Sequence, residues 1–84
     1  MIIRFHPHAQ ERMEERGATE NEVRSAVESG ERFPAKFGRV GFRRNFSYDR
    51  LWRGRLYSTK QIEVFAEEEK PQEWLVITVI TRYF

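Results

Sequence analysis

The chain has 84 residues, 39% of them apolar, and this length holds one hydrophobic core, so we expect a single domain over residues 1–84. The net charge is +2, and the absence of cysteine excludes a disulfide scaffold and a cysteine-based zinc site; with two histidines alone we expect no metal and no cofactor. No stretch approaches roughly 18 consecutive apolar residues and the N-terminus has no signal-peptide core, so we expect a cytoplasmic protein that does not enter a membrane.

The first third of the chain predicts an edge strand and two short helices. Residues 1–5 are short and mostly apolar, and an exposed edge there could pair with a second copy of the chain in a homodimer. Pro7 suits the first turn of a helix, where its missing N–H costs nothing, and Gly17 suits the left-handed residue that ends it. Thr19 and Glu22 have the spacing of a capping box, which predicts a second helix directly after that corner.

Beyond residue 30 the apolar period changes from helical to alternating, which predicts three strands. Residues 39–48 and 57–66 each alternate, whereas residues 74–84 are apolar on both parities. The last pattern predicts a central strand that is covered on both faces. A turn or long loop over residues 49–54 and an acidic turn over residues 67–72 join the strands.

These elements together predict the fold class. Phe33 and Pro34 begin the connection between the second helix and the three strands, so the predicted order is β-α-α-β-β-β. We therefore expect an α+β fold with two short N-terminal helices on one face of a largely antiparallel, four-stranded sheet.

Positive charge is concentrated in the middle third of the chain. Residues 32–60 carry nine Lys and Arg against one Asp, which gives +8, whereas residues 1–31 and 61–84 each carry −3. Seven aromatic residues lie among these cations, and arginine with aromatic rings suits single-stranded nucleic acid, where phosphates pair and bases stack. A strand with an aromatic core side and a solvated arginine side gives the same pattern, and an acidic partner protein would use the same charges.

The first helix predicts a cationic stripe. At about 100° per residue, Arg12 and Arg16 lie about 40° and 80° from His8 around the helix axis. The two arginines repel each other unless an anion lies between them, such as Glu15, a terminal carboxylate or a phosphate. The functional interpretation is a phosphate that is held or cleaved; the alternative is pairing with acids of the sheet or with helix-capping carbonyls.

Few residues suit proton transfer. Apart from His6, His8 is the only residue of the type that works as a general acid or base near neutral pH, and a surface or capping histidine is the alternative. Tyr57, Lys60 and Tyr83 are further candidates, although no motif surrounds them.

The helical segment resembles a family of small bacterial proteins of unknown function, which begin with a HAxxRhxxRGhsxxEV helical hairpin. The matching residues are His8, Ala9, Arg12, Met13, Arg16, Gly17, Ala18, Thr19, Glu22 and Val23. Residues 57–68 and 74–84 are similar to the closing strands of that family. The hairpin followed by a sheet also resembles the BrnT and RelE group of toxin ribonucleases, which are neutralised by an antitoxin.

The resemblance to these toxins implies RNA cleavage without metal, by in-line attack of a 2′-hydroxyl or with help from the ribosome, and an acidic antitoxin as partner. Of the candidate catalytic residues, His8, Arg12 and Arg16 match the family motif, and we add Lys60 and Tyr83 from charge and position. A catalytic tyrosine stands on a C-terminal tail in some such toxins, and Tyr83 could replace it if it faces the same groove. The candidate nucleic-acid contacts are Arg39, Arg43, Arg44, Arg50, Trp52, Arg53 and Arg82.

Two other functions fit the same residues. The absence of an obvious acid–base pair favours a non-catalytic nucleic-acid-binding module or a protein-interaction domain. The binding module would have an affinity that falls steeply with salt. The interaction domain would bind an acidic partner such as an antitoxin, and would have little affinity for nucleic acid at physiological salt.

Overall fold

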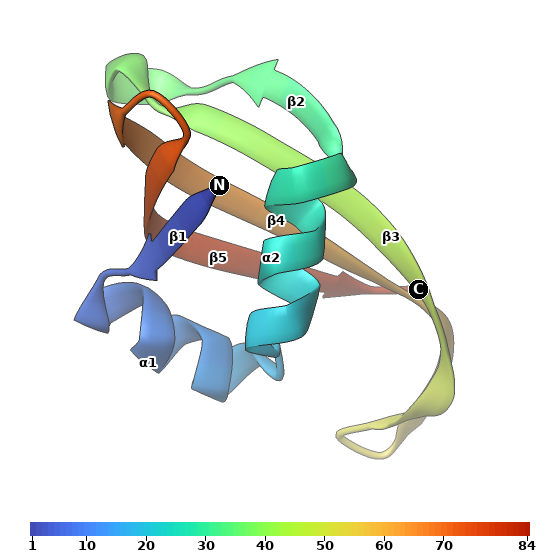
Figure 1. The fold of residues 1–84 in the computed structure, drawn as a ribbon. Coiled ribbons are helices and arrows are strands. Elements are labelled where there is room, and N and C mark those ends of the chain that lie inside the picture. Colours follow the sequence, from blue (N-terminus) through green and yellow to red (C-terminus); the bar gives the residue numbers. More distant parts are fainter.

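The computed structural model describes residues 1–84 as two helices on one face of a five-stranded sheet (Figure 1). In chain order the elements are β1 (Ile2–Phe5), α1 (Pro7–Arg16), α2 (Glu20–Ser29), β2 (Glu31–Pro34), a 3₁₀ turn (Lys36–Gly38), β3 (Val40–Trp52), β4 (Arg55–Lys70) and β5 (Glu73–Tyr83). The strand order is β1-β5-β4-β3-β2, and every neighbouring pair is antiparallel except β1 and β5. The predicted α+β class is confirmed. Neither helix is long and apolar enough to cross a membrane.

Both helices begin and end at signals in the sequence. The N-cap of α1 is His6, whose Nδ1 accepts a hydrogen bond from the backbone N–H of His8 at 3.0 Å. Gly17 ends α1 with a φ of 74°, in the left-handed region that favours glycine. The capping box of α2 is confirmed, because Thr19 and Glu22 each accept a hydrogen bond from the other's backbone N–H, at 3.2 and 2.9 Å.

The sheet has one strand more than the four predicted. Phe33 and Pro34 belong to β2, which pairs antiparallel with β3, and do not begin a connection. Proline is tolerated there because β2 lies at an edge of the sheet, where one side of the strand needs no hydrogen-bonding partner. β1 lies at the other edge, as predicted.

The hairpin of β3 and β4 is longer than predicted. β3 runs to Trp52 and β4 begins at Arg55, so the loop expected over residues 49–54 reduces to the two-residue turn of Arg53 and Gly54. Both turn residues have positive φ, 50° and 84°, which is the conformation of a type I′ turn. This turn matches the twist of the two strands and lets them pair to their ends.

A β-bulge bends the hairpin towards the helices. The strand pairing shifts between Ser47 and Arg50, and Asp49 within the bulge has a φ of 49°. Trp52 then lies against the corner between α1 and α2, where a Cβ on Gly17 would stand 2.7 Å from its Cζ3 atom. The hairpin tip, which we define as residues 50–57, therefore contacts a helical corner far from it in sequence.

The hydrophobic core lies between the helices and the sheet. Ala9 and Met13 of α1 and Val23 of α2 point into it and are buried. Phe42 of β3 packs edge-to-face on Trp74 of β5, with ring centroids 5.1 Å apart. The largest fully buried side chains are Ile62, Val23, Val64, Val76 and Val79.

The prediction that the last strand is central and covered on both faces is wrong. β4 is the central strand, and β5 lies between β4 and the short β1. A register shift opposite Phe65 and Ala66 places Val76 and Val79, which are three residues apart, in the same core. Apolar residues at both odd and even positions of β5 therefore do not require a second layer that covers the sheet. No helix covers the other side of the sheet, which we call the open face (Figure 1).

Candidate nucleic-acid interface

Three of the candidate catalytic residues meet at the C-terminal end of α1. The hydroxyl of Tyr83 donates a hydrogen bond to the carbonyl oxygen of Arg16 at 2.9 Å, and Lys60 Nζ donates to the carbonyl oxygen of Gly17. Arg16 Nη1 donates to the carbonyl oxygen of Val79 at 2.7 Å. The last carbonyls of a helix lack intrahelical partners and carry the negative end of its dipole, so cationic and hydroxyl donors stabilise them.

Lys60 is held in place by the helical corner. It is 4% exposed, and its Nζ also lies 2.8 Å from Glu22 Oε1. The rings of Tyr48 and Tyr83 stand 5.5 and 5.9 Å from the same nitrogen. The charge of Lys60 is therefore matched inside the protein, and its side chain joins the sheet to the helical corner rather than facing a substrate.

His8 and Arg12 do not join this group. His8 is exposed near the start of α1, about 12 Å along the helix axis from Arg16. Arg12 pairs with Glu15, three residues further along the helix, at 3.0 Å. The stripe predicted from the helical wheel is thus divided among a surface histidine, a neutralised arginine and an arginine that contacts the sheet.

A small pocket lies beside Arg16, between the end of α1 and the hairpin tip. Its volume is about 160 Å³, and its lining residues are Arg16, Trp52, Arg53, Thr81 and Tyr83. Trp52 stacks on Tyr83 with ring centroids 4.8 Å apart and an interplanar angle of 15°. The guanidinium group of Arg53 lies 5.1 Å from the centroid of Trp52 and donates to the carbonyl oxygen of Glu15 at 3.1 Å. We call this space the Arg16–Arg53 pocket.

Thr81 is among the residues that line this pocket, and its hydroxyl is buried. Its Oγ1 is the one buried side-chain polar atom without a hydrogen-bond partner in the protein. Leaving a buried hydroxyl unpaired costs about 1–3 kcal/mol. Neither Arg16 nor Arg53 has a carboxylate within ion-pair distance. Two unpaired guanidinium groups and an unpaired hydroxyl make the Arg16–Arg53 pocket suitable for an anion.

Tyr83 keeps its proton at neutral pH. Burial raises the pKa of Tyr83 to about 12, with Tyr48 and Glu22 acting in the same direction and Arg53 and Arg50 opposing them. Because the phenol stays protonated and donates its one O–H to the carbonyl oxygen of Arg16, it cannot act in the pocket as a general base.

The hairpin tip carries three arginines without a carboxylate partner. Each guanidinium group lies over an aromatic ring, at 4.8 to 5.6 Å from the ring centroid: Arg50 over Tyr48, Arg53 over Trp52 and Arg55 over Tyr57. The three arginines are exposed, whereas the three rings are half-buried around Tyr83. The aromatic residues of this segment therefore serve as packing, and its arginines form a positively charged surface.

Two other predicted nucleic-acid contacts lie away from the hairpin tip. Arg39 stands at the opposite end of β3, where its Nε donates to Glu67 at 3.2 Å. Arg44 points towards α2, where it donates to the hydroxyl groups of Ser25 and Ser29. The structure does not bring either residue to the Arg16–Arg53 pocket.

The last two, Arg43 and Arg82, lie on the open face around Glu63. Each donates to this carboxylate at 2.7 Å, and Arg43 also pairs with Glu31 at 2.9 Å. Burial of Glu63 acts to raise its pKa, but the hydrogen bonds from Arg82 and Arg43 and their charges outweigh burial and hold the pKa below its usual value. The hydrogen bond to Glu63 in turn raises the pKa of Arg43. These arginines are neutralised within the sheet.

Replacing Glu63 with Gln is expected to lower the free energy of unfolding by about 1–2 kcal/mol at pH 7, because two charge-assisted hydrogen bonds are weakened. A carboxyl whose pKa is lowered by folding stabilises the protein above its unfolded pKa, and this contribution disappears as the pH falls through the folded value. Urea denaturation from pH 7 to pH 3 should therefore show a shallower acid loss for the variant. Glu28→Gln, an exposed carboxylate without an ion pair, is the control, and an equal acid loss in E63Q and the native chain would contradict the assignment.

Sequence reasoning missed Thr81, although alternation places it between Val79 and Tyr83 on the side of β5 that faces the helices. It also missed Arg55 as a site residue, because the strand was expected to begin at residue 57, whereas β4 begins at Arg55. No three His, Asp or Glu side chains are grouped closely enough to hold a metal ion.

The sequence matches the model of the family described as Domain of unknown function (DUF4258) over residues 5–81. This range begins at the last residue of β1 and includes both helices, the hairpin tip and Thr81. No curated protein and no solved structure matches the sequence.

Proposed function

The chain belongs to this DUF4258 family, and we propose that it binds single-stranded RNA at the hairpin tip, with one phosphate group in the Arg16–Arg53 pocket. The observation that carries the proposal is the pocket lining, in which two guanidinium groups without carboxylate partners stand beside the unsatisfied hydroxyl of Thr81. Phosphate oxygens accept hydrogen bonds from all three groups, and arginine pairs with phosphate in a bidentate manner.

The hairpin tip extends the positively charged surface beyond the pocket. Arg50 and Arg55 are exposed and lie on either side of Arg53 in the hairpin. The phosphates on either side of the one in the Arg16–Arg53 pocket can therefore reach them. A base can stack on a guanidinium plane as well as on an aromatic ring, which suits single strands. The resemblance to BrnT and RelE toxins favours RNA among nucleic acids, and the ribosome as one source of it.

Replacing Arg50, Arg53 and Arg55 together with Gln is expected to weaken binding of a labelled mixed-sequence RNA about 100-fold at low salt. Each phosphate contact to a single strand contributes about 0.7 to the slope of log K against log salt, so the slope should fall by about 2. Fluorescence anisotropy at several salt concentrations measures both quantities.

The matched control replaces three other unpaired cations, Arg24, Lys36 and Lys70, with Gln. This variant has the same net charge as the first but an unchanged hairpin tip. If both variants lose the same affinity, binding depends on total charge and the proposed site is wrong. If the native chain binds no RNA at low salt, the RNA proposal is wrong, and an acidic protein partner such as an antitoxin becomes the function to test.

Replacing Thr81 with Val separates binding from stability. Removal of an unsatisfied buried hydroxyl should raise the free energy of unfolding by about 1 kcal/mol, while the loss of its hydrogen bond to phosphate should weaken RNA binding several-fold. Chemical denaturation and the same anisotropy assay measure the two effects. A variant that is more stable but binds RNA with native affinity would place the phosphate outside this pocket.

Cleavage of RNA at the same pocket is a second candidate, favoured by the arrangement of Arg16 and Arg53 around one phosphate-sized space. Cationic groups there would stabilise the negative charge that develops on a pentavalent phosphate in the transition state. Incubation of the native chain with labelled RNA in EDTA, beside the Arg16→Gln variant, tests it. Products with 2′,3′-cyclic phosphate ends from the native chain alone would support cleavage, whereas intact RNA with and without added ribosomes would leave binding alone.

A further inference from the structure

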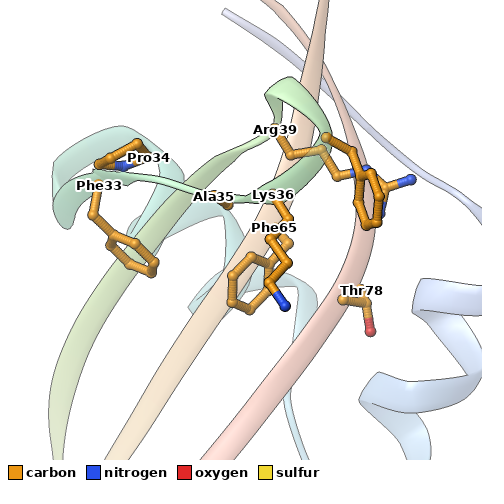
Figure 2. A pocket seen from close by; sticks show the side chains of 8 residues that line it. Phe33, Pro34, Ala35, Lys36, Arg39, Phe65 and Thr78 are labelled. Carbon is orange, nitrogen blue, oxygen red and sulfur yellow. The ribbon is translucent and has the colours of Figure 1, made fainter.

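A larger cavity opens on the open face, near the loop between β2 and β3 (Figure 2). Its volume is about 600 Å³, which lies within the range of roughly 300–1,000 Å³ typical of small-molecule sites. Phe65 lies ten residues from Arg55 along β4, a separation of about 30 Å measured along the strand. The cavity is therefore independent of the proposed RNA site.

Three of the residues that line the cavity, Phe33, Phe65 and Thr78, lie in one row across the sheet. Phe33, Gly41, Phe65 and Thr78 are aligned by the register of β2, β3, β4 and β5. Gly41 has no side chain above the sheet, and a Cβ there would collide with the ring of Phe33. The ring of Phe33 occupies that space and meets Phe65 edge-to-face, with centroids 6.0 Å apart. The glycine thus makes room for the ring of Phe33, which together with Phe65 lines the cavity.

Phe37 completes the apolar lining from the loop. Its φ of 62° and ψ of 32° lie in the left-handed region, which costs a bulky residue about 1–2 kcal/mol, and its side chain is 84% exposed. Residues held in strained conformations are concentrated at ligand sites. An exposed aromatic ring at the side of an apolar cavity offers surface that a bound molecule would bury.

Lys36 supplies an available positive charge. No carboxylate lies within ion-pair distance of it, and its side chain extends beside Phe65 in Figure 2. The other cation of the cavity, Arg39, donates to Glu67 and lies over the ring of Phe37 at 5.6 Å. One unmatched ammonium group beside three phenyl rings suits a ligand with an apolar body and a single negative charge.

From these features we propose that the cavity binds an amphipathic carboxylate, a small molecule whose apolar body packs on Phe33, Phe37 and Phe65 while its carboxylate pairs with Lys36. Thr78, at the end of the row, offers a hydroxyl to a second polar group of the ligand. Lysine acts as a point charge and does not require a bidentate partner, so one carboxylate satisfies the site.

Two probes of similar size test the proposal: 2-naphthylacetate, which carries a carboxylate, and 2-naphthaleneethanol, which is neutral. Titration of the ¹⁵N-labelled native chain should shift amide signals of residues 33–39, 65 and 78, and the carboxylate should bind about tenfold more tightly than the alcohol. Lys36→Met should remove this difference while keeping the alkyl stem. Lys70→Met, which removes another unpaired ammonium group, should preserve it.

A further variant, Phe37→Gly, tests whether weaker probe binding can be separated from loss of the folded structure. Glycine adopts the left-handed conformation without strain, so this variant should fold at least as stably as the native chain and yet bind both probes more weakly. Equal affinity for the two probes, or a preference that persists in Lys36→Met, would overturn the carboxylate assignment. Absence of shifts at the cavity with millimolar probe would overturn the site itself.

Discussion

Replacing Lys60 with Met is expected to lower the free energy of unfolding by about 3 kcal/mol, because removal of one partner from a buried ion pair leaves the other uncompensated. The variant would leave Glu22 facing the core side of the sheet and the carbonyl oxygen of Gly17 without its donor. Urea denaturation at pH 7 measures the loss.

Two controls identify its cause. Lys70→Met, at an exposed and unpaired position, should change the stability by less than about 0.5 kcal/mol. Adding Glu22→Gln to Lys60→Met should recover part of the loss, because no unpaired charge then remains. A double variant that is less stable by the full sum of the two single effects would show that the two side chains do not act as a pair.

Gly17→Ala is expected to lower the free energy of unfolding by about 2–4 kcal/mol. The φ of 74° alone costs an alanine about 1 kcal/mol. The added Cβ would also stand 2.7 Å from the ring of Trp52 and 2.8 Å from the hydroxyl of Tyr83, so the hairpin tip must move away from the helical corner. RNA affinity should fall as well, because that movement opens the Arg16–Arg53 pocket.

Gly54→Ala is the matched control. Gly54 also has a positive φ, 84°, but nothing lies within 4 Å of a Cβ built on it. The free energy of unfolding of this variant should fall by about 1 kcal/mol, which is the cost of the positive φ without any added steric contact. Equal losses in the two variants, measured by urea denaturation, would mean that the contact between the hairpin tip and the corner contributes nothing to stability.

The helices and most strands are predictable because their signals are local. The capping box at Thr19 and Glu22 and the left-handed Gly17 act within a few residues, so the sequence alone places the helical corner. Phe33 and Pro34 were expected to begin a connection, and the edge position that permits a proline in β2 depends on which strands become neighbours, a property of the whole chain. The turn at Arg53 and Gly54 was missed because arginine is an uncommon residue at positive φ.

The candidate site was only partly predictable, since charge composition does not reveal pairing. The arginines of residues 32–60 divide into those that meet a carboxylate and those that do not. Arg43 is neutralised by Glu63, 20 residues away, because the register of β3 and β4 places the two residues opposite each other. Arg53, in the turn between these strands, has no carboxylate opposite it. Lys60 and Tyr83 were named as catalytic candidates from charge and position, and the structure places both beside the end of α1, where their donors are used by its backbone.

The parallel pairing of β1 with β5 has a consequence for how the chain reaches its fold. Ile2 pairs opposite Glu73, and the backbone N–H of His6 donates to the carbonyl oxygen of Val76 at 2.9 Å, so this contact closes the segment between residues 2 and 73 into one loop. Contacts of such sequence separation form slowly, whereas the hairpin of β3 and β4 joins neighbouring residues. During synthesis β1 (Ile2–Phe5) therefore leaves the ribosome well before its partner strand β5 (Glu73–Tyr83) is made. Ile3, which is buried in the folded core, therefore lacks this partner strand until β5 has been made.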